Sequence, residues 1–139
     1  MKNKIIGFTQ GTFDMFHIGH LNLIKNAKAK CDYLIIGVNT DELVIEYKNK
    51  KPIIPLEERI EIIEAISYVD KVVVTSTLDK YTHYKEYKFQ KLFIGDDWKN
   101  SERWKKTELE MGKEGVVVEF LPYTKNTSST LIRKKLEEI

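Results

Sequence analysis

The chain lacks several features that would define its environment. Cys31 is its single cysteine, so no intramolecular disulfide can form and a reducing compartment is expected. No apolar run approaches the roughly 18 residues that a membrane-spanning helix needs. Residues Met1 to Lys4 lead into a short β-like run without a small-residue cleavage site, so no secretory signal is expected. With 23 basic and 21 acidic residues, the net charge of +2 argues against a polybasic nucleic-acid binder. We therefore expect a cytoplasmic protein with no nucleic-acid or membrane partner.

Proline and glycine are also scarce, and they mark no boundary in the chain. The three prolines and seven glycines are scattered, and no low-complexity stretch, repeat or linker separates two parts. A chain of 139 residues with 42% apolar residues is long enough to bury one core. We therefore expect a single domain over residues 1–139.

The sequence does contain a regular alternation of short apolar runs and amphipathic segments. Five runs have the composition and length of strands: Ile5–Thr9, Tyr33–Val38, Lys71–Thr75, Lys91–Ile94 and Val116–Leu121. Helices are expected after His20, from a first-turn proline at Pro55, over Ser101–Met111 with an end at Gly112, and over Ser128–Leu136. This order predicts an α/β, Rossmann-like, doubly wound five-stranded parallel sheet of order 3-2-1-4-5. Ligands of such sheets bind beyond the carboxyl ends of strands 1 and 4.

The segment after the first predicted strand, residues 10–20, is unusual in composition. Gly11 permits a tight turn, and Gly19 stands where a helix begins and its free N–H groups attract phosphate. His17 and His20 are three residues apart, so they face the same side of the first helical turn and can donate hydrogen bonds to phosphate oxygens. We expect no metal site here, because the third histidine, His83, is remote in the sequence.

This segment resembles the signature of the cytidylyltransferase branch of the nucleotidyltransferase superfamily, and residues 17–20 spell His-Ile-Gly-His. Class I aminoacyl-tRNA synthetases share that tetrad, but 139 residues leave no room for their tRNA-binding parts. The resemblance implies that His17, His20 and Lys48 are catalytic, with Lys48 in a mobile lysine-rich loop that closes over a triphosphate. The same resemblance implies nucleotide binding by Thr12, Phe13, Asp14, Gly19 and Lys50.

The resemblance extends to two later loops. Residues 95–98, Gly-Asp-Asp-Trp, match the glycerol-3-phosphate cytidylyltransferases in particular, which implies that Asp97 binds nucleotide. Hydroxyl side chains before the last helix match the family string that binds phosphates at a helix N-terminus. They are Thr124, Ser128, Ser129 and Thr130.

The remaining similarities concern the second substrate. Arg59, Asp70 and Trp98 match positions that the resemblance implies are substrate-binding. The chain departs from the family at two places, because Ser67 and Tyr123 stand where the family has arginines. These departures put the standard acceptor in question.

The resemblance as a whole implies transfer of CMP from CTP to a small phosphomonoester, with glycerol 3-phosphate as the expected acceptor and CDP-glycerol and pyrophosphate as products. The alternatives are another small alcohol phosphate or phosphonate, ATP in place of CTP, or an inactive nucleotide-binding module. Mg²⁺ bound mainly through the CTP phosphates, with Asp14 as a contributor, is the implied cofactor. A homodimer is expected because five aromatic residues offer more apolar surface than one small domain readily covers. They are Tyr81, Tyr84, Tyr87, Trp98 and Trp104.

Overall fold

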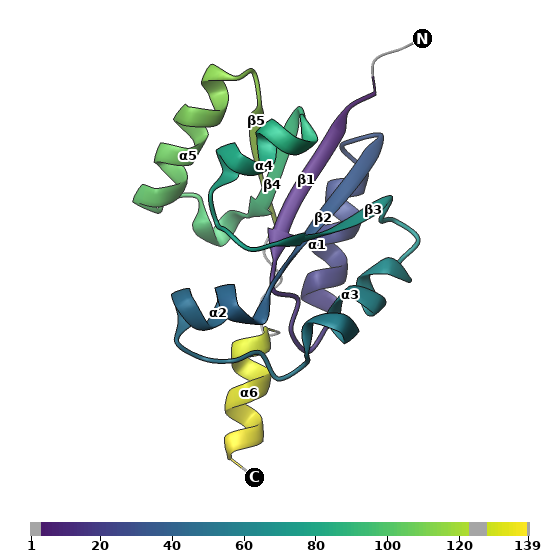
Figure 1. The fold of residues 1–139 in the computed structure, drawn as a ribbon, viewed down its shortest axis with the longest axis vertical. Helices are drawn as coiled ribbons and strands as arrows, with labels where there is room; N and C mark the ends of the chain where they lie inside the picture. The colour runs from purple at the N-terminus through teal and green to yellow at the C-terminus, as the bar shows by residue number, and fades with distance from the viewer. Residues whose placement is uncertain (1–3, 123–127, 139) are drawn as a thin grey trace.

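The computed structural model describes residues 4–122 and 128–138. Its centre is a five-stranded sheet of order β3-β2-β1-β4-β5, in which every paired strand is parallel to its neighbour (Figure 1). The strands are β1 (Ile6–Gly11), β2 (Tyr33–Asn39), β3 (Lys71–Thr75), β4 (Lys91–Gly95) and β5 (Val117–Leu121). The helices are α1 (Ile18–Lys28), α2 (Asp41–Lys48), α3 (Leu56–Glu64), α4 (Lys80–Tyr87), the 3₁₀ turn η1 (Asp96–Trp98), α5 (Glu102–Lys113) and α6 (Ser129–Glu137). The predicted fold class and strand order are confirmed.

Helices cover both faces of the sheet, and each face has its own apolar core. Along β2, Leu34 and Ile36 join one cluster while Ile35 joins the other, because successive side chains of a strand point to opposite faces. The first cluster includes Ile24 of α1 and Ile63 of α3, and the second includes side chains of α4 and α5. β1 lies at the middle of the sheet, so the chain winds away from it in both directions and leaves a crevice at its carboxyl end.

Two helices, α2 and α4, were not predicted from the sequence. Residues of α2 were expected in a mobile lysine-rich loop, but Thr40 caps this helix with its hydroxyl, which accepts from the Leu43 N–H at 3.0 Å. Lys48 is the last residue of α2 rather than part of a loop. The buried residues of α4 are Lys80 and His83, so the sequence has no apolar periodicity that predicts this helix.

Other predicted boundaries shift by a few residues. Pro55 precedes α3 as its N-cap instead of standing in its first turn, and α5 continues past Gly112 to Lys113. Within α3, Ile63 is buried and Ile62 is 42% exposed. No helix in residues 4–122 and 128–138 is long and apolar enough to cross a bilayer.

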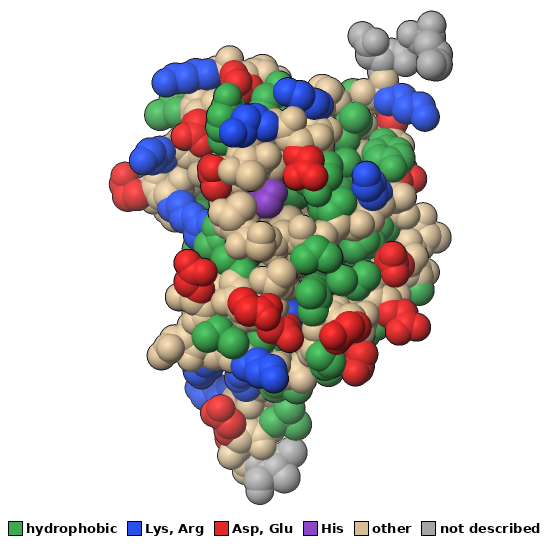
Figure 2. All heavy atoms as spheres, viewed as in Figure 1, with side chains coloured by type: hydrophobic (Ala, Val, Ile, Leu, Met, Phe, Trp, Pro, Cys, Tyr) green, Lys and Arg blue, Asp and Glu red, His purple; other side chains and the backbone are tan. Residues whose placement is uncertain are grey.

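The aromatic residues that suggested a dimer surface lie mostly inside the domain. Trp104 is buried, and Tyr84 and Tyr87 pack against the same core cluster. Only Tyr81 and Trp98 remain substantially exposed, at 38% and 48%. The view in Figure 2 shows basic and acidic side chains intermixed over that face, with no block of one sign. The sequence argument for a homodimer therefore loses most of its support.

Candidate active site

A cavity of about 660 Å³ opens at the carboxyl end of β1, the place predicted from the strand order. It is bordered by the loop after β1, by α2 and the segment that follows it, by the start of α4, by η1 and α5, and by the start of α6. Nine predicted site residues border it: Thr12, Phe13, Asp14, His20, Lys48, Lys50, Trp98, Ser129 and Thr130. Segments far apart in the sequence thus meet at one crevice.

The loop after β1 has a strained backbone. Phe13 and Met15 both have positive φ angles, 54° and 48°, a region that bulky L-residues rarely adopt. The buried Phe13 ring lies edge-on to the His20 ring at 5.4 Å and over Gly11, where a Cβ atom would come 3.0 Å from it. A side chain at position 11 would therefore press on the Phe13 ring, and the packed ring positions the imidazole of His20.

The two histidines form a reciprocal cap at the start of α1. His17 Nδ1 accepts from the Gly19 N–H at 3.0 Å, and His20 Nδ1 accepts from the His17 N–H at 3.3 Å. Because each Nδ1 is an acceptor, each neutral ring carries its proton on Nε2. The rings stack with centroids 3.9 Å apart, and His17 Nε2 is buried without a hydrogen-bond partner among the described residues. An unpaired N–H donor is thus held next to His20.

The surroundings keep both imidazoles neutral. The pKa of His20 is lowered from 6.5 to about 3, mainly by burial and also by His17 and Lys48, while Asp14 opposes the shift. Burial also lowers the pKa of His17. At neutral pH the pair therefore offers two neutral N–H donors, which suits stabilisation of negative charge that develops on a bound phosphate.

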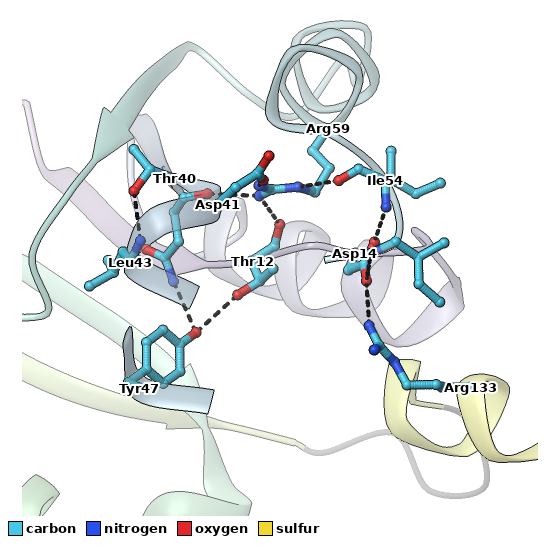
Figure 3. Close-up of polar contacts among 11 residues, drawn as sticks. Thr12, Asp14, Thr40, Asp41, Leu43, Tyr47, Ile54, Arg59 and Arg133 are labelled. Carbon is cyan, nitrogen blue, oxygen red and sulfur yellow. Dashed lines mark hydrogen bonds and ion pairs between the residues drawn. The ribbon is translucent and has the colours of Figure 1, made fainter. Parts of the chain in front are cut away.

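Asp14 connects the histidine loop to two other segments. Its carboxylate accepts from the backbone N–H groups of Ile53 and Ile54 at 2.9 and 2.8 Å and from Arg133 at 3.2 Å (Figure 3). The Ser129 hydroxyl donates to the Asp14 carbonyl oxygen. Asp14 therefore fastens the segment before α3 and the start of α6 at the cavity.

Arg59 lies beneath the site and is fully buried. Its guanidinium donates to the carbonyl oxygens of Ile54, Thr12 and Asn39, at 2.9, 2.8 and 2.8 Å, and pairs with Asp41 (Figure 3). It does not border the cavity. Its donors are committed to the loops that surround the site, so this geometry gives no support to the expectation that Arg59 contacts a substrate, which stays a prediction.

A row of polar side chains crosses the carboxyl ends of the central strands. Gln10 Nε2 donates to Asn39 Oδ1 at 2.8 Å, Asn39 Nδ2 donates to the Tyr47 hydroxyl at 3.3 Å, and that hydroxyl lies 3.0 Å from Thr12 Oγ1. At the other end, Lys80 Nζ donates to Gln10 Oε1 at 2.6 Å. Four of these cavity residues were not predicted from the sequence: Gln10, Asn39, Tyr47 and Lys80. The strand-end position of Gln10 and Asn39 is the signal that could have identified them.

Several predicted site residues do not border the cavity. Asp70 precedes β3 at the amino edge of the sheet, where its carboxylate accepts from Lys28 Nζ at 2.6 Å and the Leu34 N–H at 2.7 Å. The cavity lies at the opposite edge, so the structure does not bring Asp70 to it, and substrate binding by Asp70 stays a prediction without support from this geometry. The Gly19 N–H is taken by His17, so it is not a free phosphate donor as expected.

Three further predicted residues lie near the cavity without bordering it, and a fourth lies outside the described residues. His17 is the N-cap of α1, and its ring stacks on that of His20, which does border the cavity. Ser128 caps α6 by accepting from the Leu131 N–H at 3.1 Å. Asp97 lies in η1 with its side chain largely exposed, and partial desolvation together with the neighbouring Asp96 raises the pKa of its carboxyl. Thr124 falls outside the described residues.

The described residues do not form a cage for a metal ion. Asp14 is the only carboxylate that borders the cavity within residues 4–122 and 128–138, and its oxygens already accept three donors. No group of three or more histidine, cysteine or acidic side chains in the same ranges is arranged to hold a metal. The residues that the structure describes therefore supply no cage of their own for magnesium, and the occupied oxygens of Asp14 do not fit the contribution expected of it.

A family model described as Cytidylyltransferase-like matches residues 8–135. The chain belongs to the cytidylyltransferase-like family. It is 36% identical over 132 residues to a glycerol-3-phosphate cytidylyltransferase of Bacillus spizizenii, a match that covers 94% of this chain and 96% of that protein. A glycerol-3-phosphate cytidylyltransferase of Bacillus subtilis is 33% identical over 129 residues, which cover 92% and 94% of the two chains. This protein is accordingly a nucleotidyltransferase.

Two solved structures of other proteins share this fold. The lipopolysaccharide core biosynthesis protein of Thermoplasma volcanium superposes with a TM-score of 0.73 at 23% identity, covering 90% of this chain and all of that one. The pantoate-beta-alanine ligase of Francisella tularensis superposes with a TM-score of 0.64 at 20% identity, covering all of this chain and 72% of that one. At such identities the likeness concerns the fold alone.

Proposed function

We propose that this protein is a glycerol-3-phosphate cytidylyltransferase, which makes CDP-glycerol and pyrophosphate from CTP and glycerol 3-phosphate. The observation that carries the proposal is the pair of stacked neutral imidazoles at the carboxyl end of β1. The similarity to two relatives named for this activity, over more than nine-tenths of the chain, supports the choice of substrates.

In the proposed reaction an oxygen of the acceptor phosphate attacks the α-phosphorus of CTP. A new P–O bond forms, the bond to the bridging oxygen breaks, and pyrophosphate leaves with its electron pair. The phosphate dianion is already a nucleophile, so no general base is needed, and catalysis depends on positioning and charge stabilisation. His17 and His20 donate from Nε2 to the oxygens on which charge builds.

The cavity also supplies cations and hydroxyls for the triphosphate. Lys48 and Lys50 border it at the end of α2 and have no ion-pair partner in the described part of the chain. Ser129 and Thr130 border it at the start of α6, where free N–H groups favour phosphate. In our proposal these groups hold the β- and γ-phosphates, and any Mg²⁺ is carried by the nucleotide itself.

The test is pyrophosphate release by the purified full chain with CTP and a panel of phosphomonoesters that includes glycerol 3-phosphate. We expect turnover with this pair and a fall of at least about 100-fold in kcat for His17→Asn and His20→Asn. Asparagine keeps an acceptor at each Nδ1 position, so the helix cap survives while the Nε2–H donor is lost. Near-normal turnover in folded variants would contradict the role of the histidines.

The two departures from the family favour a second candidate. Ser67 and Tyr123 replace family arginines, which favours another small alcohol phosphate or a phosphonate as acceptor. The same panel, extended to phosphonates and to ATP in place of CTP, separates these cases. Turnover with no combination would leave only an inactive nucleotide-binding module. A homodimer, a cytoplasmic location and a role in cell-surface polysaccharide synthesis belong to this proposal as well.

A further inference from the structure

The unpaired cations of the cavity come from two different sides of β1. Lys48 and Lys50 lie at the end of α2, which follows β2. Arg103 lies in the first turn of α5, which packs on β5. β2 and β5 are on opposite sides of β1 in the sheet, so the lysines and Arg103 belong to segments on different sides of the central strand.

Arg103 is free to bind a ligand, unlike the other arginine at the cavity. Its side chain is exposed and makes no ion pair or hydrogen bond within residues 4–122 and 128–138. Arg133 is held by Asp14 at 3.2 Å. A guanidinium has five N–H donors in a planar fork that matches two oxygens of a phosphate.

The wall beside Arg103 is rigid and already carries positive charge. Lys80 Nζ donates to Gln10 Oε1 at 2.6 Å and to the Leu78 carbonyl oxygen at 3.0 Å, and it lies 5.5 Å from the centre of the Trp104 ring. Burial, together with repulsion from Arg103, lowers the pKa of Lys80 to about 7. An anion bound beside Arg103 would offset this repulsion, and Lys80 already commits two of its three N–H donors to Gln10 and Leu78.

We propose that Arg103 binds the phosphate of the acceptor substrate and is a specificity-determining residue of the reaction proposed above. The inference rests on that function, which brings a triphosphate and a separate phosphate dianion into one cavity. Lys48, Lys50 and the start of α6 serve the triphosphate. Arg103 is then the cation bordering the described cavity that is neither paired nor assigned, and its helix packs on the β5 side of the sheet, away from α2.

Kinetics of Arg103→Gln test the proposal, with Lys106→Gln as the matched control. Lys106 is on the same helix, also exposed, and borders only a smaller groove of about 310 Å³ between α4 and α5. We expect Arg103→Gln to raise the KM for glycerol 3-phosphate at least about 10-fold while the KM for CTP stays within about twofold. Arg103→Lys should give an intermediate KM, because it keeps the charge and loses the fork.

Three results would overturn the proposal: an unchanged KM for glycerol 3-phosphate, a rise only in the KM for CTP, or an equal effect in Lys106→Gln. If the wild-type protein releases no pyrophosphate with this pair, the proposed function itself fails. The proposal on Arg103 is then decided by titration with inorganic phosphate, followed by the fluorescence of Trp98 and Trp104, which both border the cavity and are the two tryptophans of the chain. Saturable phosphate binding whose Kd rises at least about 10-fold in Arg103→Gln supports the subsite. Equal Kd values for the wild type and the variant, or no saturation in either protein, refute it.

Discussion

The substitution Arg59→Met tests whether the buried guanidinium holds the site together. Methionine has a similar reach and packs in a closed environment, but it donates no hydrogen bond. The change would leave the carbonyl oxygens of Thr12, Asn39 and Ile54 without their donor and the Asp41 carboxylate without its cation. These groups lie in three segments that meet around the cavity.

The expected loss of stability follows from the burial of this ion pair. The Arg59 side chain is fully buried and that of Asp41 is 22% exposed. Removal of one partner from a buried, hydrogen-bonded pair costs about 3–5 kcal/mol. An unfolding entropy of about 2.1 cal/mol/K per residue is roughly 0.3 kcal/mol/K for a chain of this length, so the Tm should fall by about 10–17 °C.

Thermal unfolding followed by circular dichroism measures this shift, with Lys105→Met as the control. Lys105 is exposed, so its replacement removes an equal charge without breaking a buried network, and its Tm should change by no more than about 2 °C. Arg59→Lys should restore only part of the loss, because one ammonium group has three donors and no planar fork. A Tm for Arg59→Met within about 3 °C of the wild type would refute the assigned role.

Three further predictions concern charged and titratable groups at the site. The pKa of His20 is about 3 in the folded protein and about 6.5 in the unfolded chain, so the unfolded chain binds more protons at mildly acidic pH. The free energy of unfolding therefore decreases as the pH is lowered below about 6.5. His20→Asn should therefore lose about 2 kcal/mol less stability than the wild type between about pH 7.5 and about pH 5 in urea titrations, and parallel losses would contradict the neutral imidazole. Asp14→Asn should lower the Tm and increase proteolysis at the start of α6, since an amide cannot accept from Ile53, Ile54 and Arg133 together; unchanged cleavage would argue against this link. Lys80→Met should shift the fluorescence of the chain by removing the cation beside the Trp104 ring, and an identical spectrum would contradict that contact.

The sheet could be predicted from the sequence because its strands are short apolar runs separated by turn and helix signals. Four of the five predicted strands extend or shift by one or two residues at an end, and Lys71–Thr75 matches its strand fully. The helix α4 was not predicted, because its buried residues are Lys80 and His83 rather than aliphatic side chains. Apolar periodicity cannot register a helix whose buried face consists of a lysine and an imidazole.

The candidate site was predictable where a motif and the strand order agreed. His20, Asp14 and the hydroxyls of α6 border the crevice because the loops at the carboxyl ends of parallel strands must converge there. Asp70 also lies in a motif, but it precedes its strand, and the amino end of a strand is at the opposite edge of the sheet. The position of a motif relative to its strand therefore decides whether its residues can reach the cavity.

Arg59 and Arg103 show what a sequence could not distinguish. Each is an arginine in or near the first turn of a helix, and each is followed by a large side chain, Ile60 or Trp104. Arg59 is enclosed because carbonyl oxygens from three segments surround its guanidinium, whereas Arg103 is exposed at the mouth of the cavity without a partner in the described residues. Those acceptors come from residues up to 47 positions away, so only the folded chain separates a positioning arginine from one that can bind an anion.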